Sequence, residues 1–224
     1  MKIIIINGSP RTNGLTASLL HSIEKNLKSR SADIDTEYFD LSRLSMSQCV
    51  GCCSCYTTGH CHMKDDAELL YEKIKDADGL ILGSPTYASN VSGYMKLLID
   101  RGHFVIEQLL TGKYCVTVTT GENYGSRDAS RVLNNLVLYS GGHLADKSVM
   151  NAPFNDLTSV SSKVEHLARR SADKLYTAMT RRRFYLFQHL FHLIILNIGI
   201  RRFVLKKGVS YQGVVDKWKE LGIL

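Results

Sequence analysis

The chain has 224 residues, of which 44% are hydrophobic and 22% are charged. These fractions are ordinary for globular proteins and exclude a disordered, collagen-like or coiled-coil chain, and the length fits one domain with an appendage. The formal net charge is +7, which favours an acidic partner. However, residues 163–224 hold thirteen Lys or Arg and four Asp or Glu, a net of +9, which leaves fifteen against seventeen, a net of −2, for residues 1–162. The excess positive charge therefore belongs to the C-terminal part.

Apolar runs of strand length alternate with segments of helical period through most of the chain. Such alternation predicts βαβ units, a parallel sheet and helices on both of its faces. The β-branched run Ile3–Ile6 is typical of a central strand that is buried on both sides. We expect strands at Ile3–Ile6, Thr36–Leu41, Gly79–Gly83, Tyr114–Thr119 and Gly142–Val149, and helices at about Thr16–Lys28, Asp65–Lys75, Ser92–Leu110, Ser126–Tyr139 and Thr158–Thr180.

The loop after the first predicted strand has the composition of a phosphate site. Small residues, hydroxyls and one Arg lie between a strand end and a helix start, where backbone N–H groups and the helix dipole favour an anion. The loop lacks the Gly-Lys-Ser/Thr ending of a Walker loop and the three glycines of a dinucleotide fingerprint. A plain turn with a helix cap is the alternative interpretation. The candidate residues are Ser9, Arg11, Thr12, Asn13, Gly14, Leu15 and Thr16.

Two further loops follow the third and fourth predicted strands. Ligands bind parallel sheets beyond the carboxyl ends of the strands, so these loops should lie beside the first one. In the second loop, Pro85 fixes the backbone and Tyr87 offers a ring or a hydroxyl. Both loops suit the polar edge of a flat heterocycle. The candidates are Pro85, Thr86, Tyr87, Ala88, Asn90 and Val91 in the second loop, and Thr120, Gly121 and Asn123 in the third.

These motifs resemble those of the NADPH-dependent FMN reductase family of flavodoxin-like proteins. They are Gly8-Ser9-Pro10-Arg11 with Asn13-Gly14-x-Thr16, then Ser84-Pro85-Thr86-Tyr87, then Met95-Lys96-x-x-x-Asp100-Arg101. The resemblance implies an α/β fold with a doubly wound, five-stranded parallel sheet in the order 2-1-3-4-5, which we place in a domain at residues 1–155. It also implies that the first loop holds the FMN phosphate, that the other two hold the isoalloxazine, and that Asp100-Arg101 fixes helix packing.

The same resemblance implies the chemistry. We expect a flavin-dependent oxidoreductase that moves electrons from NAD(P)H through FMN to a flavin, quinone or protein acceptor. Because the flavin N5 carries out the reaction, no catalytic side chain is expected. The alternative is a non-enzymatic carrier, in which FMN and an iron–sulfur cluster pass electrons between redox proteins.

Five of the six cysteines fall in a loop at residues 49–61. Clustered thiols in a chain without a recognisable signal peptide indicate a cytoplasmic protein with metal or redox chemistry. The spacing Cys49-x2-Cys52-x2-Cys55-x5-Cys61 suits a [4Fe–4S] cluster and, with Asp65-Asp66 after it, resembles the iron–sulfur flavoprotein branch of the family. Two alternatives stay open: a zinc site that includes Cys53, His60 or His62, and reduced thiols without a metal.

The basic segment at residues 156–224 is predicted to be a helical extension. Its apolar run Phe184–Ile200 is too short and too polar for a transmembrane helix. Gln188 and His192 fall on a narrow stripe, which leaves a wide apolar face that must be buried. We favour a subunit interface of a homodimer or homotetramer, with membrane-surface contact as the alternative. Nucleic acid is not an expected partner, because the basic residues bracket an apolar run instead of alternating with aromatic residues.

Overall fold

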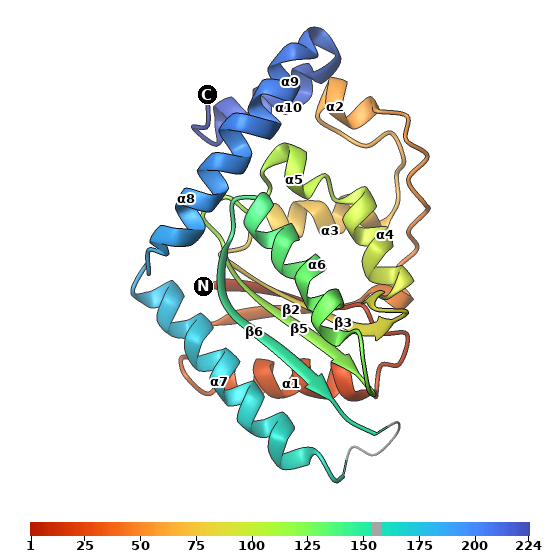
Figure 1. Ribbon diagram of the computed structural model, residues 1–224, viewed down its shortest axis with the longest axis vertical. Coiled ribbons are helices and arrows are strands. Elements are labelled where there is room, and N and C mark those ends of the chain that lie inside the picture. Colours follow the sequence, from red (N-terminus) through yellow and green to blue (C-terminus); the bar gives the residue numbers. More distant parts are fainter. Residues whose placement is uncertain (154–157) are drawn as a thin grey trace.

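The computed structural model describes residues 1–153 and 158–224 and has a parallel β-sheet at its centre (Figure 1). The strand order is β2-β1-β3-β5-β6, with a short β4 paired antiparallel to the end of β3. The predicted doubly wound sheet is therefore confirmed, with one added strand. The strands are β1 (Lys2–Asn7), β2 (Asp35–Asp40), β3 (Gly79–Tyr87), β4 (Asn90–Val91), β5 (Tyr114–Gly121) and β6 (His143–Asn151).

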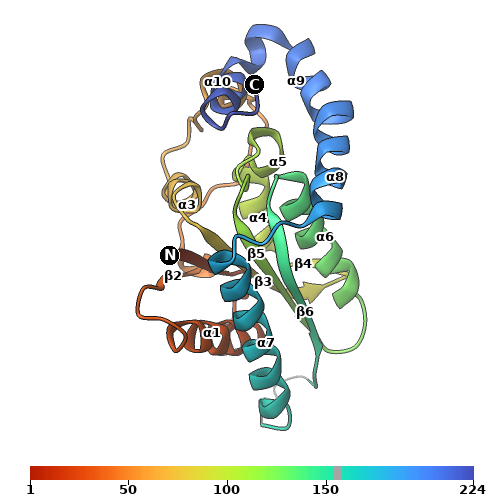
Figure 2. The ribbon, with the colours of Figure 1, turned by 90° about the vertical axis from the view of Figure 1, so that its left-hand side faces the viewer.

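Helices cover both faces of this sheet (Figures 1 and 2). The helices are α1 (Leu15–Lys28), α3 (Asp66–Lys75), α4 (Gly93–Arg101), α5 (Phe104–Glu107), α6 (Ser126–Tyr139) and α7 (Ser161–Thr180). Successive side chains of a strand point to opposite faces. Ile3 and Ile5 of β1 therefore pack with α1 and α7, while Ile4 and Ile6 pack with the other four helices. All four isoleucines are fully buried.

The predicted single helix Ser92–Leu110 is wrong, because the chain breaks it into α4 and α5. Gly102 follows the last residue of α4, and His103 takes a left-handed φ of 49°. The buried ring of Phe104 fixes this break, since a Cβ at Gly102 would come within 2.1 Å of it. Apolar periodicity does not distinguish one long helix from two helices that share a buried face.

The second predicted loop is largely a β-hairpin. β3 continues through Pro85 and Thr86 to Tyr87 instead of ending at Gly83. Ala88 and Ser89 both have left-handed φ angles, 48° and 61°, and form the two-residue turn into β4. This part of the sheet edge is therefore held by strand pairing.

The end of the chain divides into a helix of the body and an extension. α7 lies in the core of the body, where Ala168, Ala172 and Leu175 are fully buried. The predicted domain boundary between residues 155 and 156 lies outside the described residues and stays a prediction. After α7 the chain runs alongside α6 and ends beside the Cys-rich segment (Figures 1 and 2). The remaining elements are η1 (Leu41–Arg43), α2 (Ser54–Thr58), α8 (Leu186–Ile194), η2 (Ile195–Ile200), α9 (Arg201–Lys206), η3 (Gly208–Tyr211) and α10 (Gln212–Glu220).

A search of the described ranges finds no helix with the length and apolar character that a membrane span requires.

Candidate functional site

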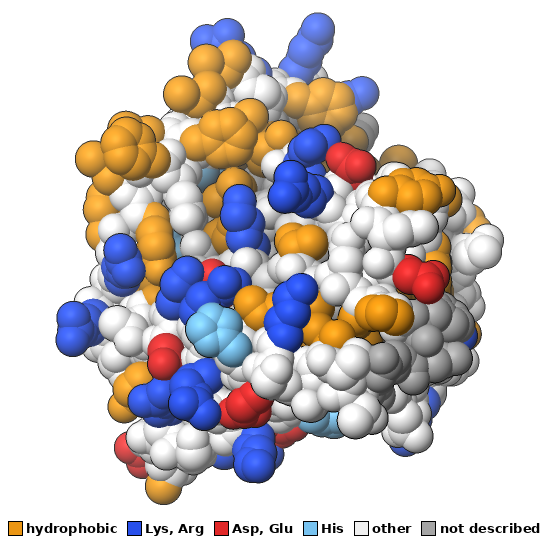
Figure 3. All heavy atoms as spheres, turned by 60° about the horizontal axis from the view of Figure 1, so that its bottom comes forward, with side chains coloured by type: hydrophobic (Ala, Val, Ile, Leu, Met, Phe, Trp, Pro, Cys, Tyr) orange, Lys and Arg blue, Asp and Glu red, His pale blue; other side chains and the backbone are white. Residues whose placement is uncertain are grey.

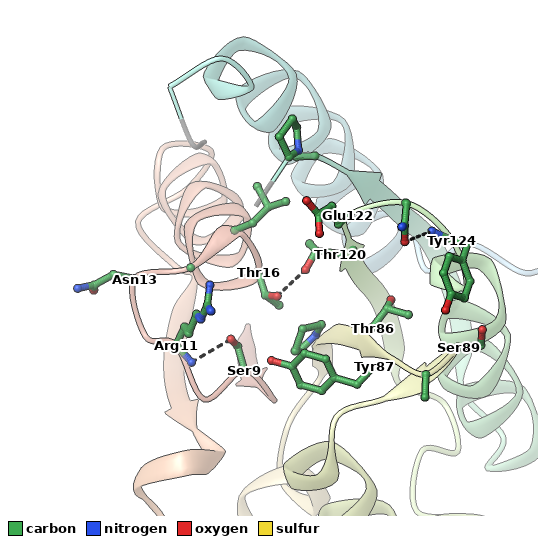
Figure 4. A pocket seen from close by; sticks show the side chains of 18 residues that line it. Ser9, Arg11, Asn13, Thr16, Thr86, Tyr87, Ser89, Thr120, Glu122 and Tyr124 are labelled. Atoms are coloured by element: carbon green, nitrogen blue, oxygen red, sulfur yellow. Dashed lines mark hydrogen bonds between the residues drawn. The ribbon is translucent and has the colours of Figure 1, made fainter. Parts of the chain in front are cut away.

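A cavity of about 610 Å³ lies at the carboxyl edge of the sheet. Three strand ends meet there, and Figure 4 shows their side chains around a common space. The structure brings thirteen of the sixteen predicted FMN residues to its wall. They are Ser9, Arg11, Asn13, Gly14, Leu15, Thr16, Pro85, Thr86, Tyr87, Ala88, Thr120, Gly121 and Asn123.

Three predicted residues lie elsewhere. Thr12 does not line the cavity, Asn90 is exposed and its side chain accepts a hydrogen bond from the backbone of Val91, and Val91 is buried in the core. The hairpin explains the last two, because Asn90 and Val91 belong to its return strand. The sequence prediction also omits part of the wall: Ser89, Glu122, Tyr124, Ala152 and Pro153. Ala152 and Pro153 follow the end of β6, which the carboxyl-edge rule would have indicated.

The first loop presents a helix N-terminus to one end of the cavity. Gly14, the N-cap residue of α1, has an extended backbone, and no side chain caps this helix. The N–H groups of a first helical turn are therefore available to an anion. Arg11 lies on the same loop, and its backbone N–H donates to Ser9 Oγ at 3.1 Å. This end suits a phosphate.

Backbone contacts hold this loop against the sheet. Gly8 N–H donates to the Gly83 carbonyl at 2.7 Å, and Ser92 Oγ donates to the Gly8 carbonyl at 2.5 Å. A Cβ at Gly8 would lie 2.9 Å from the Cβ of Met95, so only glycine allows this approach. Further along, the hydroxyls of Thr16 and Thr120 hydrogen-bond at 2.7 Å and join the first loop to β5.

The other end of the cavity offers an unsatisfied polar atom. The Thr86 hydroxyl oxygen is buried and has no hydrogen-bond partner among the described residues. A buried hydroxyl without a partner is costly, and such atoms indicate a ligand. Tyr87 is 48% exposed, so its ring is free to cover a ligand. Gly121 allows the end of β5 to pack closely against the start of α6, since a Cβ there would lie 2.3 Å from Ser126 Oγ.

The cysteine loop forms a second region. Cys49, Cys52 and Cys53 are exposed, whereas Cys55 and Cys61 are half-buried. Burial, together with the charges of Glu107, Cys61 and Cys52, raises the pKa of Cys55 to about 12. Cys52 Sγ lies 3.2 Å from His62 Nδ1. Within the described residues, no three His, Cys, Asp or Glu side chains come together as a metal ion requires.

Thiols on one loop have the right chemistry for an iron–sulfur cluster, but they do not converge in this structure. The residues as placed therefore do not fit a metal.

A buried ion pair anchors the cysteine loop to the body. The Arg101 side chain, 1% exposed, donates to both oxygens of Asp65 at 2.8 Å and to the Ser47 carbonyl at 2.6 Å. Its Nη2 also lies 3.6 Å from Cys61 Sγ. Burial opposes ionisation of Asp65, but the bonds from Arg101 and two backbone N–H groups hold its pKa below the ordinary value. Asp100 instead pairs with Lys96 at the surface.

The C-terminal helix closes over the same region. Lys217 of α10 and the Tyr71 hydroxyl donate to Glu107 Oε2 at 2.6 and 2.7 Å, and His103 Nδ1 lies 3.1 Å from Oε1. Burial disfavours the charged form of Glu107, yet His103 and Lys217 more than offset this and keep its pKa below the ordinary value.

The fold defines a flavodoxin-like protein, and the cavity lies at the carboxyl edge of its sheet. The profile of the NADPH-dependent FMN reductase family matches residues 1–156, so the chain belongs to that family and is a flavin-dependent oxidoreductase by class.

Known relatives extend this result. An iron–sulfur flavoprotein of Clostridioides difficile (strain 630) is 34% identical over 226 residues, with 100% of both chains covered. A second, from Methanocaldococcus jannaschii, is 34% identical over 143 residues, which are 62% of this chain and 72% of that protein. The NAD(P)H:quinone oxidoreductase of Methanothermobacter marburgensis has a TM-score of 0.62 at 17% identity over 79% of this chain and 97% of that one, which supports the fold. The predicted cytoplasmic location and homo-oligomer stay predictions.

Proposed function

We propose that the cavity binds FMN, with its phosphate at Ser9–Thr16 and its isoalloxazine between the β3 hairpin and the Thr120–Asn123 loop, and that NAD(P)H is the electron donor. The observation that carries the proposal is one cavity with an uncapped helix N-terminus at one end and the unpartnered Thr86 hydroxyl at the other. Its volume lies within the range of about 300–1,000 Å³ that small-molecule sites occupy. When bound, FMN supplies hydride acceptance and electron transfer.

The side chains of the cavity would bind FMN and orient it. Arg11 and the first turn of α1 balance the charge of the phosphate, and the Thr86 hydroxyl donates to a polar atom at the ring edge. Tyr87, 48% exposed at the mouth, sits where it can cover one face of a flat ring. No side chain is required as an acid or base, which agrees with a wall whose charged residues are Arg11 and Glu122 alone among the described lining residues.

We further propose a small-molecule acceptor, such as a quinone or free flavin, that occupies the cavity mouth after the nucleotide leaves. For the nucleotide and the acceptor to bind in turn, one face of the flavin ring must stay open to solvent. The 48% exposure of Tyr87 shows that the cavity is open at this end. Relatives named as an NAD(P)H:quinone oxidoreductase and an FMN-dependent NADPH-azoreductase support this acceptor class.

The first test is FMN binding by the apo-protein. Substituting Arg11→Gln removes one charge-assisted interaction, worth about 1.5–3 kcal/mol, so FMN affinity should fall about 10- to 150-fold. Arg169→Gln is the matched control, because Arg169 lies on α7 with its side chain 64% exposed and, among the described residues, pairs only with Glu165 on its own helix. Equal FMN affinity in Arg11→Gln and Arg169→Gln would remove the phosphate assignment.

The second test separates an enzyme from an electron carrier. The carrier is the competing candidate because the exposed cysteine loop and the iron–sulfur names of relatives favour it. Anaerobic mixing with NADPH or NADH should bleach the flavin absorbance of the reductase. A flavin that only a reduced redox protein bleaches, in a preparation with iron and sulfide, would support the carrier instead.

A further inference from the structure

The extension exposes an unusual amount of apolar surface. Eleven of the eighteen exposed large hydrophobic side chains of the described residues lie between Phe184 and Val209. The elements α8, η2 and α9 form one continuous helical rod along the flank of the molecule (Figures 1 and 2). Phe187 is 85% exposed and Ile198 is 63% exposed. Apolar side chains this exposed, and gathered on one rod, mark a contact surface.

The rod faces the body with its polar side. Gln188 accepts from the Leu144 backbone N–H at 2.8 Å and donates to the Leu144 carbonyl at 3.0 Å, and His192 Nδ1 lies 3.0 Å from the Leu138 carbonyl. The Leu144 groups lie on the edge strand β6, where backbone groups need partners. The Leu138 carbonyl belongs to the last turn of α6 and, among the described residues, otherwise accepts only backbone bonds of the helix end, such as that from the Gly141 N–H at 3.5 Å. The predicted stripe of Gln188 and His192 is therefore the inner face, so the wide apolar face points outward.

Four-residue spacing continues this inner face to the end of the rod. Leu196 and Val204 are buried against Val214 and Trp218, and Ile200 packs on the same cluster. In an α-helix, positions four apart drift around the axis, but the π-helical η2 has more residues per turn and cancels the drift. The outer face, with Leu190, Ile194 and Ile198, is thus kept straight and uncovered.

Positive charge surrounds this outer face and negative charge is absent from it. Between Asp173 and Asp216 the sequence contains no Asp or Glu. Seven cations flank the exposed apolar residues, and within the described ranges none of the seven forms an ion pair with a carboxylate. Figure 3 shows hydrophobic and Lys or Arg side chains side by side in the upper part of its view. The seven are Arg181, Arg182, Arg183, Arg201, Arg202, Lys206 and Lys207.

We propose that this face, defined as the exposed side chains of residues 181–209, docks on an anionic lipid surface. An amphipathic helix with apolar side chains bordered by cations lies in the plane of a membrane interface and is attracted by anionic headgroups. A second copy of the chain fits less well, because a twofold contact brings the same patch against itself. Seven cations would then meet seven cations, with no carboxylate nearby to separate them.

Vesicle flotation of the FMN-loaded full chain tests the proposal. Vesicles of phosphatidylcholine with about 30% phosphatidylglycerol should carry the protein, whereas pure phosphatidylcholine should carry about tenfold less. Two variants should each weaken binding to the anionic vesicles about tenfold or more: Phe187→Ser with Ile198→Ser, and Arg202→Gln with Lys206→Gln and Lys207→Gln. The first pair is highly exposed, so folding should be unaffected.

A matched control variant distinguishes binding through this face from binding through the overall net charge. The triple variant Arg43→Gln, Arg131→Gln and Arg169→Gln removes the same charge from side chains 71%, 70% and 64% exposed on the body, and it should bind the anionic vesicles like the wild type. An equal loss in this control, or no wild-type binding, overturns the proposal. So does a wild-type dimer in light scattering that Phe187→Ser with Ile198→Ser converts to a monomer, because the occupant is then a second copy.

Discussion

The proposed FMN cavity and the cysteine loop are held in place by different parts of the molecule. The cavity is made by strand ends, and its first loop is held by the Gly8 to Gly83 hydrogen bond and by the Thr16 and Thr120 hydroxyl pair. The cysteine loop follows β2. Arg101 of α4 anchors it through Asp65, and it is covered by α10, which packs on α2 and lies about 150 residues later in the chain. One region is part of the sheet and the other is closed by the tail, so each can be disturbed without the other.

Truncation of Trp218 should give the largest difference between the effect on the cysteine loop and the effect on the proposed FMN cavity. This side chain is fully buried, and its Nε1 donates to the Ile106 carbonyl at 2.9 Å. Trp218→Ala should destabilise the packing of α10 by about 3–5 kcal/mol, measured by chemical denaturation. Cys55 and Cys61 should then react with a thiol reagent much faster, while FMN affinity stays within about twofold.

Phe187→Ala is the control for this truncation. It also removes an aromatic ring, but from a side chain that is 85% exposed, so the free energy of unfolding should change by less than about 0.5 kcal/mol. Loss of FMN binding in Trp218→Ala would show that the two regions are one cooperative unit.

Removal of the Glu107 charge should also weaken the region that α10 covers, and the loss of stability should depend on pH. The folded-state pKa of Glu107 lies below its ordinary value of 4.5, so its ionisation stabilises the fold above that pH, and this stability is lost as the pH falls through the lowered pKa. Glu107→Gln leaves Lys217 without its partner and should cost about 3 kcal/mol at neutral pH. Below the lowered pKa the variant and the wild type should unfold alike, because both then carry an uncharged side chain.

Asp65 makes a separate contribution to that pH profile. The pKa of Asp65 is also lowered, through Arg101 and backbone N–H groups, so the Glu107→Gln variant should keep part of the acid sensitivity of the wild type. A constant difference between Glu107→Gln and the wild type from neutral to acid pH would contradict the assignment of Glu107 as a buried anion.

The same contrast explains what could be predicted from the sequence. Strand order, the cavity edge and most of its wall follow from local patterns, because alternation of elements and the carboxyl-edge rule act along the chain. The composition of a loop does not give its backbone shape, so it does not indicate that Ser89 and Glu122 line the cavity. Ser89 lies in the hairpin turn, where its φ is 61°.

Long-range packing accounts for what could not be predicted. The break at Gly102 depends on where the Phe104 ring packs, and the contact of Gly213 with Gly59 joins residues that no periodicity relates. Gln188 and His192 form a recognisable stripe, but the direction it faces depends on the open backbone groups of β6 and α6.

Two glycines of the extension provide a smaller test of the tail's role. A Cβ at Gly213 would lie 2.0 Å from the backbone nitrogen of Gly59, so Gly213→Ala pushes α10 away from α2 and should cost about 1–3 kcal/mol in unfolding free energy. Gly199→Ala meets nothing within 4 Å and should stabilise its helix by up to about 1 kcal/mol. Thiol reactivity of Cys55 should rise in the first variant and stay constant in the second. Similar effects of both substitutions would show that α10 does not close the loop.

The smallest effect should come from Thr86, and its sign is informative. Its buried hydroxyl has no partner among the described residues, so Thr86→Val removes an unsatisfied polar atom and should leave the apo-protein equally stable or more stable by up to about 1 kcal/mol. The same change should weaken FMN binding about two- to tenfold, because one hydrogen bond of about 0.5–1.5 kcal/mol to the ring is lost.

Thr117→Val should behave in the opposite way. Thr117 is also buried on β5, but its hydroxyl donates to Asn134 Oδ1 at 2.6 Å and it does not line the cavity. Its loss should destabilise the apo-protein by about 1 kcal/mol and leave FMN affinity unchanged. Calorimetric FMN titration and denaturation of both variants therefore distinguish a hydroxyl kept for the ligand from one kept for the fold. If Thr86→Val destabilised the apo-protein without changing FMN affinity, the hydroxyl would belong to the fold, and the ring end of the cavity would need a different polar contact.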